Sequence, residues 1–176
     1  MPKPSERVVI ITGAVGNLGL ATAHAVQAAG DKTVLVDRSH DKLRNAFGRI
    51  AESADHLLAG GVDLSDAASL SKFIGDTLAR FARIDALVHT VGAWRGGKPV
   101  HETDLADWDL LFNVNLRTTL LCCRAVIPQM LKQGGGKIIT VASRDGLVGT
   151  AGYAAYSASK SAVLRLTERS RRRPPR

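Results

Sequence analysis

Blocks of apolar residues alternate along the chain with stretches in which apolar residues recur every three or four positions. The blocks are rich in β-branched residues and predict five strands: RVVIIT, KTVLVD, HLLAGGVD, IDALVHTVG and GGGKIITVAS. The periodic stretches predict helices over roughly 18–29, 41–53, 66–81, 107–132 and 153–169. Apolar strands that alternate with helices are typical of right-handed βαβ units in a parallel sheet that is buried on both faces.

This pattern predicts an α/β fold, a Rossmann-like doubly wound parallel sheet with strand order 3-2-1-4-5 and ligands at the carboxyl ends of the strands. Gly30 is expected to end the first helix, Ser65 to cap the helix at 66–81, and Pro128 to kink the long helix. A chain of 176 residues can bury one core, so residues 1–168 are expected to form one domain. Residues 169–176 are expected to be a disordered basic tail.

Composition narrows the class of protein. Apolar residues make up 45% and charged residues 23%, as in ordinary soluble globular proteins. The apolar runs are too short to cross a bilayer, and the N-terminus leads into the first strand without a signal peptide. The adjacent Cys122 and Cys123 point in different directions on a helix, so neither a disulfide between them nor a metal site is expected. We therefore expect a cytoplasmic protein that binds no membrane and no metal.

The net charge of +8 raises the question of nucleic-acid binding. Residues 169–176 hold five arginines, so that the rest of the chain carries the remaining +3. No aromatic residues interleave with these arginines to stack on bases. Binding of nucleic acid is therefore the least favoured of the functions considered, and retention on DNA that depends on residues 169–176 would support it.

A glycine-rich segment, TGAVGNLG at 12–19, connects the first predicted strand to the first predicted helix. Glycines in such a turn allow a tight bend and close approach of the backbone to a pyrophosphate, which then meets the N–H groups of the helix N-terminus. Asp37 ends the second predicted strand, 18 residues beyond Gly19, where a carboxylate can accept hydrogen bonds from an adenosine ribose. The alternative is that these are ordinary turn glycines and that Asp37 caps a helix.

Asp37 also bears on the choice of cofactor. Its carboxylate would repel the 2′-phosphate of NADP, so NAD is preferred, although Arg38 could turn toward that phosphate and NADP stays possible. Asp63, which is expected to close the third strand, could meet the adenine amino group. It could equally be an ordinary residue before the next helix.

The second candidate site involves Tyr156 and Lys160, which lie on the same face of a predicted helix because they are four residues apart. A tyrosine hydroxyl with an ordinary pKa of about 10 is a poor proton carrier near neutrality, and an ammonium group one turn away stabilises the phenolate form. Ser143 is expected at the end of the fifth predicted strand, 13 residues before Tyr156. Its hydroxyl could hold a substrate oxygen beside the tyrosine, although a serine after a strand can also be a simple turn residue.

Taken together, TGAVGNLG, Asp37, the segment VDLSD, the segment NVNL, and Ser143 followed by YSASK resemble the short-chain dehydrogenase/reductase family over residues 6–168. The resemblance implies that Tyr156 is the catalytic acid/base, that Lys160 supports it and binds the nicotinamide ribose, that Ser143 orients the carbonyl, and that Asn115 holds a water in a proton relay. It also implies a set of cofactor-binding residues: Gly13, Gly16, Asn17, Leu18, Gly19, Asp37, Arg38, Asp63, Leu64, Gly92, Tyr156 and Lys160.

Three features depart from that family. The glycine spacing is similar to that of the family's extended branch rather than to its commonest pattern. The fourth strand ends in HTVG instead of Asn-Asn-Ala-Gly, so only Gly92 matches and the sheet-stabilising role of the first asparagine is in doubt. The chain also ends in RSRRRPPR where members of the family continue through two more strands and a lid. This ending suggests a truncated or frame-shifted reading of a longer gene.

The leading interpretation is an NAD(P)-dependent oxidoreductase that interconverts a small-molecule alcohol and a carbonyl compound. The alternative is a dinucleotide-binding protein with little or no turnover, because the carboxamide-binding loop and the lid of the family are missing. The resemblance further implies a homodimer or homotetramer formed through residues 107–132 and 153–169. The substrate is not predicted, and Trp94 is the candidate aromatic residue of its pocket.

Overall fold

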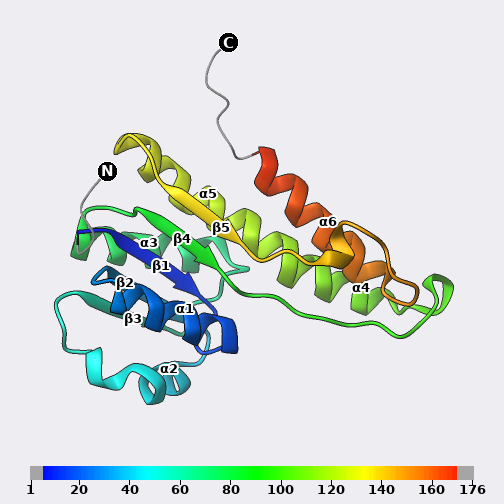
Figure 1. Cartoon of the computed structure of the whole chain (residues 1–176), viewed down its shortest axis with the longest axis horizontal. Helices are drawn as coiled ribbons and strands as arrows, with labels where there is room; N and C mark the ends of the chain where they lie inside the picture. Colours follow the sequence, from blue (N-terminus) through cyan, green and yellow to red (C-terminus); the bar gives the residue numbers. More distant parts are fainter. Residues whose placement is uncertain (1–5, 170–176) are drawn as a thin grey trace, which may run out of the picture. The chain divides into compact units, whose positions relative to one another are not determined.

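The computed structural model describes residues 6–169 and contains a five-stranded sheet in the order β3-β2-β1-β4-β5 (Figure 1). The strands are β1 Val8–Thr12, β2 Lys32–Asp37, β3 His56–Gly60, β4 Ala86–His89 and β5 Lys137–Thr140. β1 pairs in parallel with β2 and with β4, and β2 pairs in parallel with β3. The predicted α/β class, parallel sheet and strand order are thus confirmed.

The helices follow the strands as the alternation of patterns predicts. They are α1 Asn17–Ala28, α2 His40–Phe47, α3 Ala67–Phe81, α4 Leu105–Leu111, α5 Thr118–Lys132 and α6 Ala154–Arg169. Short 3₁₀ turns lie at η1 Gly48–Ile50, η2 Val100–Glu102 and η4 Arg144–Gly146, and the π-helical segment η3 Phe112–Arg117 joins α4 to α5. The helix predicted over 107–132 is therefore one continuous helix from 105 to 132 with a π segment inside it.

The described chain divides into two compact units. The sheet unit comprises residues 6–91 and 121–139, and the helical unit comprises residues 92–120 and 140–169. The predicted division into a domain at 1–168 and a tail at 169–176 stays a prediction, and residues 170–176 lie outside the described residues.

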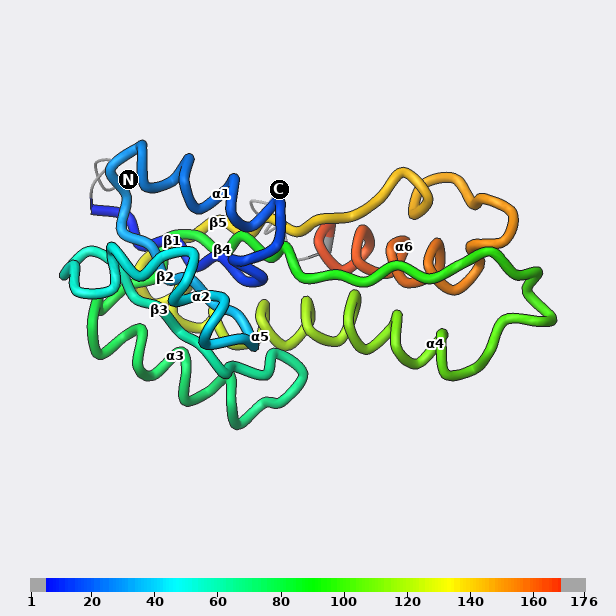
Figure 2. Tube along the Cα trace, turned by 90° about the horizontal axis from the view of Figure 1, so that it is seen from below, coloured from blue at the N-terminus to red at the C-terminus, as the bar shows by residue number. Residues whose placement is uncertain are grey.

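The core of the sheet unit has two layers, one on each face of the sheet. Val8, Ile10, Val34 and Val36 pack with buried residues of α3 and α5, whereas the alternate strand residues Val9, Ile11 and Leu35 pack with α1 and α2. Figure 2 shows α1 on one side of the strands and α3 on the other. Burial on both faces explains why these strands are continuous apolar runs instead of alternating ones.

Three local predictions need correction. The second helix ends at Phe47 instead of continuing to 53, and η1 follows it. The third strand ends at Gly60, because the next residue, Gly61, has a φ of +76° that turns the chain out of the sheet. The cap of α3 is Asp66, whose carboxylate accepts from the backbone N–H of Ser69 at 2.6 Å, and not Ser65.

The long helix contains an extended apolar stretch. Leu105–Lys132 is 28 residues long and contains an 18-residue window with a mean hydropathy of 1.3, so by length and composition alone it could cross a membrane. Three of its residues, Cys122, Val126 and Met130, are buried in the core of the sheet unit. Core packing accounts for part of this composition, since 39% of that window is buried. Burial raises the pKa of the Cys122 thiol to about 12. Pro128 lies inside α5, which continues to Lys132.

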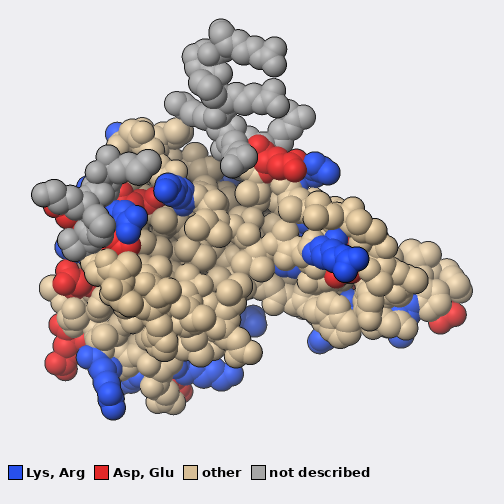
Figure 3. All heavy atoms as spheres, in the orientation of Figure 1, with Lys and Arg blue, Asp and Glu red and all other residues tan. Residues whose placement is uncertain are grey.

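Charged side chains of both signs are interspersed on the face drawn in Figure 3. Many are paired: Arg7 with Asp31 at 2.6 Å, Arg83 with Asp85 at 2.7 Å, and Lys72 with Asp76 at 2.7 Å. Of these three pairs, both partners are exposed only in the pair of Lys72 with Asp76, which contributes little to stability, about 0–1 kcal/mol. Asp31 and Asp85 are mostly buried. The described part of this face is therefore that of an ordinary mixed-charge protein.

Candidate functional site

The turn between β1 and α1 has the backbone that the glycine pattern predicts. Gly13 has a φ of +67°, and a Cβ on Gly19 would lie 2.1 Å from the Gly13 carbonyl oxygen. α1 begins after Gly16 with neither a side-chain cap nor an acidic residue in its first turn. The N–H groups of that turn are therefore free of side-chain partners and fit a bound anion such as a pyrophosphate.

Asp37 lies beside this turn at the carboxyl end of β2. The backbone N–H of Ala14 donates to the Val36 carbonyl at 3.1 Å, which ties the glycine turn to the residue before Asp37. The half-buried Asp37 carboxylate accepts from the backbone N–H of Ser39 at 3.0 Å, and Arg38 is exposed. The residues predicted to meet the pyrophosphate and the ribose are thus neighbours, as expected for a dinucleotide.

Asp63 and Leu64 lie in the loop beyond β3, so Asp63 does not close that strand as predicted. The Asp63 carboxylate accepts from the backbone N–H of Ser65 at 2.8 Å and from its hydroxyl at 2.7 Å, and these bonds lower the pKa of Asp63. The Leu64 side chain belongs to the core of the sheet unit. A ligand at this loop could therefore contact the backbone of Leu64 and the ionised carboxylate of Asp63.

The second candidate site lies in the helical unit around Lys160 of α6. Its side chain is only 5% exposed, and its Nζ donates to the backbone carbonyl of Val141 at 2.8 Å. Burial lowers the pKa of Lys160. A Cβ added to Gly92 would lie 3.3 Å from both Lys160 Nζ and Asn115 Oδ1, so these three residues converge. Tyr156 is half-buried one turn before Lys160 on the same helix.

Asn115 lies in the π segment and is only 1% exposed. Its Oδ1 accepts from the Ala93 N–H at 2.8 Å, and its Nδ2 donates to the Ala93 carbonyl at 3.0 Å and to Ser159 Oγ at 2.9 Å. The side chain therefore connects the segment after β4 to α6. A π segment is frequently found at functional sites. The predicted water relay stays a prediction.

The turn that carries Ser143 packs against α6 beside Lys160. A Cβ on Gly146 would lie 2.8 Å from the Lys160 carbonyl carbon, and Ser161 Oγ donates to the Gly146 carbonyl. Ser143 is half-buried and caps this turn, three residues beyond the end of β5 and not at the end itself. Close packing at Gly146 thus brings the Ser143 turn to the helix of Tyr156.

Two features of the site were missed by the sequence analysis. His89 stands where the family has its first asparagine, and its buried ring pairs with Thr12 Oγ1 at 2.8 Å, which links β4 to β1. Asp145 contacts Ser143 directly through its side chain. The departure at HTVG was recognised, but the sequence alone does not give the partner of His89. Ser-x-Asp is too short and too common a pattern to have indicated Asp145.

Trp94 and Tyr153 form an aromatic pair in the helical unit. Their ring centroids are 5.6 Å apart, and the Gly97 N–H donates to the Gly152 carbonyl at 2.8 Å, which joins the two loops. Trp94 is 55% exposed. A shallow hollow beside Tyr153 is lined by Arg95, Gly96, Lys98, Thr103, Asp107, Leu111, Gly152, Ala154 and Ala155.

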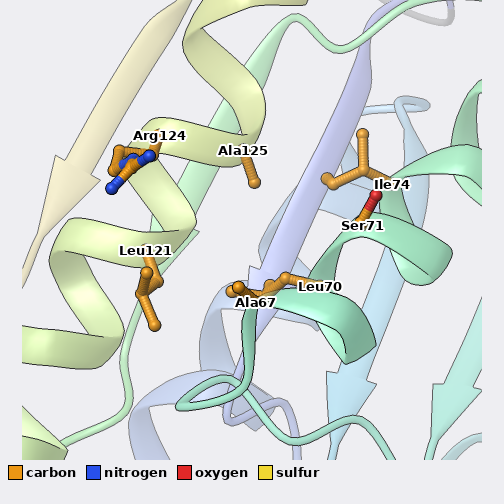
Figure 4. Close-up of a pocket in the computed structure, with 7 residues that line it drawn as sticks. All are labelled: Ala67, Leu70, Ser71, Ile74, Leu121, Arg124 and Ala125. Atoms are coloured by element: carbon orange, nitrogen blue, oxygen red, sulfur yellow. The ribbon is translucent and has the colours of Figure 1, made fainter.

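A larger hollow of about 260 Å³ lies between α3 and α5 of the sheet unit (Figure 4). It is lined by Ala67, Leu70, Ser71, Ile74, Leu121, Arg124 and Ala125. This lining holds no carboxylate, imidazole or phenol that could exchange a proton near neutral pH. Within residues 6–169, no three His, Cys, Asp or Glu side chains gather in a way that could hold a metal ion. Lys160 and its neighbours therefore stay the candidate catalytic residues.

Comparison with known proteins gives the family. The model of the family described as short chain dehydrogenase matches residues 7–173. The chain belongs to the short-chain dehydrogenase family. It is 38% identical to 2-(R)-hydroxypropyl-CoM dehydrogenase of Xanthobacter autotrophicus, over 93% of this chain and 66% of that protein. It is 33% identical to levodione reductase of Leifsonia aquatica, over 94% of this chain and 63% of that protein.

Solved structures of the family agree with this assignment. The structure of NAD⁺-bound xylitol dehydrogenase matches with a TM-score of 0.88 and 28% identity, over 96% of this chain and 65% of that one. Levodione reductase matches with a TM-score of 0.86 and covers 94% of this chain and 65% of its own. The chain thus spans just under two thirds of the length of the first curated relatives that it matches, between 63% and 66%.

Proposed function

We propose that this protein is an NAD(P)-dependent oxidoreductase that interconverts a small-molecule alcohol and the corresponding carbonyl compound. The proposal rests above all on one observation: the Ser143 turn packs on α6 at the buried Lys160, one turn from Tyr156. Membership of the short-chain dehydrogenase family supports it, as do the names of relatives that are dehydrogenases and reductases.

NAD is the proposed cofactor. The first turn of α1 would hold the pyrophosphate, and Asp37 would accept hydrogen bonds from the adenosine ribose. Because a carboxylate repels the 2′-phosphate of NADP, binding of NADP requires Arg38 to compensate. The other residues proposed to contact the cofactor outside the glycine turn include Asp63, Leu64 and Gly92. When bound, the nicotinamide supplies the hydride acceptor for alcohol oxidation and the hydride donor for the reverse reaction.

Tyr156 is the proposed acid/base. In alcohol oxidation its phenolate takes the hydroxyl proton of the substrate while the carbon gives up a hydride, and in carbonyl reduction the phenol returns that proton. The ammonium group of Lys160 is proposed to support Tyr156 from the next turn of α6 and would bind the nicotinamide ribose. Ser143 holds the substrate oxygen. Asn115 supports the arrangement by fixing the Ala93 backbone, and it would hold a relay water.

Trp94 and Tyr153 are proposed to form an apolar wall of the substrate pocket. The pair presents ring surface three residues before Tyr156, and Leu147 and Val148 on the loop between η4 and Tyr153 are exposed as well. Such a wall fits an alcohol or ketone with an apolar substituent better than a charged or strongly hydrated one.

Two measurements test this proposal. Titration calorimetry should give tighter binding of NADH than of NADPH, and Asp37→Ala should narrow the difference. Spectrophotometric assays with 1-phenylethanol and NAD⁺ should then show formation of NADH. Tighter binding of NADPH by the unmodified chain would contradict the cofactor assignment. Binding without any turnover of alcohols or ketones would favour a dinucleotide-binding protein instead.

A further inference from the structure

Ser143 shares two hydrogen bonds with Asp145. Ser143 Oγ donates to the carboxylate oxygen Oδ2 of Asp145 at 3.0 Å, and the backbone N–H of Asp145 donates to Ser143 Oγ at 3.2 Å. The other carboxylate oxygen accepts from Thr150 Oγ1 at 2.7 Å. An ionised carboxylate can only accept hydrogen bonds, so the direction of the bond from Ser143 is set by chemistry.

This arrangement limits what Ser143 can offer to a ligand. A hydroxyl group has one hydrogen, and here that hydrogen is directed at Asp145. What remains on Ser143 Oγ is acceptor capacity, which suits the O–H of an alcohol. The oxygen of a carbonyl compound needs a donor, and it would have to displace a charged carboxylate, which is the stronger acceptor.

We infer that Asp145 is a positioning residue that turns the Ser143 hydroxyl so that the site favours the alcohol form of its substrate over the carbonyl form. This inference rests on the proposed function, since it takes Ser143 as the group that holds the substrate oxygen. Binding of the carbonyl form then requires the Ser143 hydroxyl to rotate away from Asp145.

The surroundings of Asp145 keep its carboxylate ionised. Hydrogen bonds from Thr150 and from Ser143, together with the charge of Arg144, lower the pKa of Asp145. The acceptor that holds the Ser143 hydrogen therefore persists at neutral pH. Thr150 also fixes the carboxylate from the loop that leads to Tyr153, so its orientation does not depend on Ser143 alone.

The test compares binding of a matched pair, 1-phenylethanol and acetophenone, to the full chain by ligand-observed NMR. The alcohol is measured with NADH and the ketone with NAD⁺, mixtures in which neither can react. Asp145→Asn keeps the shape of the side chain, but its amide can donate to Ser143 Oγ and release the hydroxyl hydrogen. We expect this variant to shift the ratio of the two dissociation constants toward the ketone by roughly threefold to tenfold, the range of one hydrogen bond.

Two controls separate this role from a merely structural one. Thr150→Val removes one hydrogen bond to Asp145 but keeps the carboxylate that holds the Ser143 hydrogen, so it should change the ratio much less than Asp145→Asn does. In a Ser143→Ala background, Asp145→Asn should no longer alter the ratio, because the group through which it acts is absent. A ratio that Asp145→Asn does not change, or changes equally without Ser143, overturns the inference while the proposed function stands. If the cofactor binds but neither probe does, both are overturned.

Discussion

At the residue scale, Tyr156 and Tyr153 offer a matched pair. Tyr153 immediately precedes α6, Tyr156 lies in its first turn, and only Tyr156 is proposed to carry a proton. Tyr156→Phe removes the hydroxyl alone and should lower kcat by about 10²–10⁴-fold, the usual contribution of general acid–base catalysis. Tyr153→Phe keeps the ring against Trp94 and should leave kcat within about twofold of the unmodified protein. Steady-state assays check both, and equal losses in the two variants would exclude Tyr156 as the acid/base.

Lys160 is the second residue whose chemistry can be isolated. Its ammonium group is buried and donates to a neutral carbonyl. Keeping this charge buried for the proposed function therefore lowers the stability of the folded chain. Burial lowers the pKa of Lys160 in the folded chain below the 10.5 of the unfolded chain, so the unfolded chain holds the proton more tightly. The loss of stability is complete at pH values below the pKa of Lys160 in the folded chain. It decreases as the pH rises toward the pKa of Lys160 in the unfolded chain.

Lys160→Met removes this titration and should abolish turnover. The free energy of unfolding of the unmodified protein should therefore increase, relative to that of the variant, as the pH rises through the window that ends at 10.5. Urea unfolding at a series of pH values from neutral upward measures this difference. A difference that stays constant or falls with rising pH would show that the ammonium group is not penalised by burial.

At the element scale, the glycine turn before α1 is tested by two alanine substitutions in helices of the sheet unit. Gly19→Ala places a Cβ against the backbone of Gly13, which cannot move aside easily, and should destabilise the protein by about 1–3 kcal/mol and weaken dinucleotide binding. Gly75→Ala in α3 meets open space and should stabilise by about 0.5–1 kcal/mol through helix propensity. Thermal unfolding and NADH titration check both, and similar effects of the two changes would refute the packing argument.

The strands and helices were predictable because the burial of their residues follows a regular pattern along the chain. Val34, Leu35 and Val36 point alternately to two cores, and such a run can only be a strand buried on both faces. Their ends were less predictable. Gly61 turns the chain out of β3 through a positive φ, although GGVD reads as a continuation of the strand. The π segment around Asn115 changes the hydrogen-bond spacing by one residue, which leaves no mark on the apolar pattern.

The candidate site was predictable to a similar degree. Tyr156 and Lys160 share a helix face because of their spacing, and the resemblance to the family supplied Ser143, Asn115 and Gly92. The sequence could not give the orientation of the Ser143 hydroxyl, because it depends on a side-chain contact within the turn. Nor could it give the burial of Lys160, which depends on the packing of the Ser143 turn and of Gly92. The periodicity of apolar residues does not predict which loops contact one another.

At the scale of the whole molecule, the long helix leaves part of its apolar surface uncovered. Leu120 and Leu131 of α5 are 39% and 50% exposed, and Leu116 and Leu164 are half-buried. We propose that helices 107–132 and 153–169 form a two-fold contact with a second copy of the chain, as the resemblance implies. Burying these leucines against their symmetry copies would remove an apolar surface that a monomer leaves in water.

Leu120→Arg is expected to weaken this assembly, because it places a charge in an apolar contact where the two-fold axis brings like charges together. Sedimentation equilibrium should show a dimer or tetramer for the unmodified chain and a dissociation constant at least about tenfold higher for the variant. Leu147→Arg is the matched control, because Leu147 is equally apolar and 71% exposed but lies on the loop after η4, outside the proposed contact. A monomer at high concentration before any substitution, or equal dissociation by both variants, would rule out this contact.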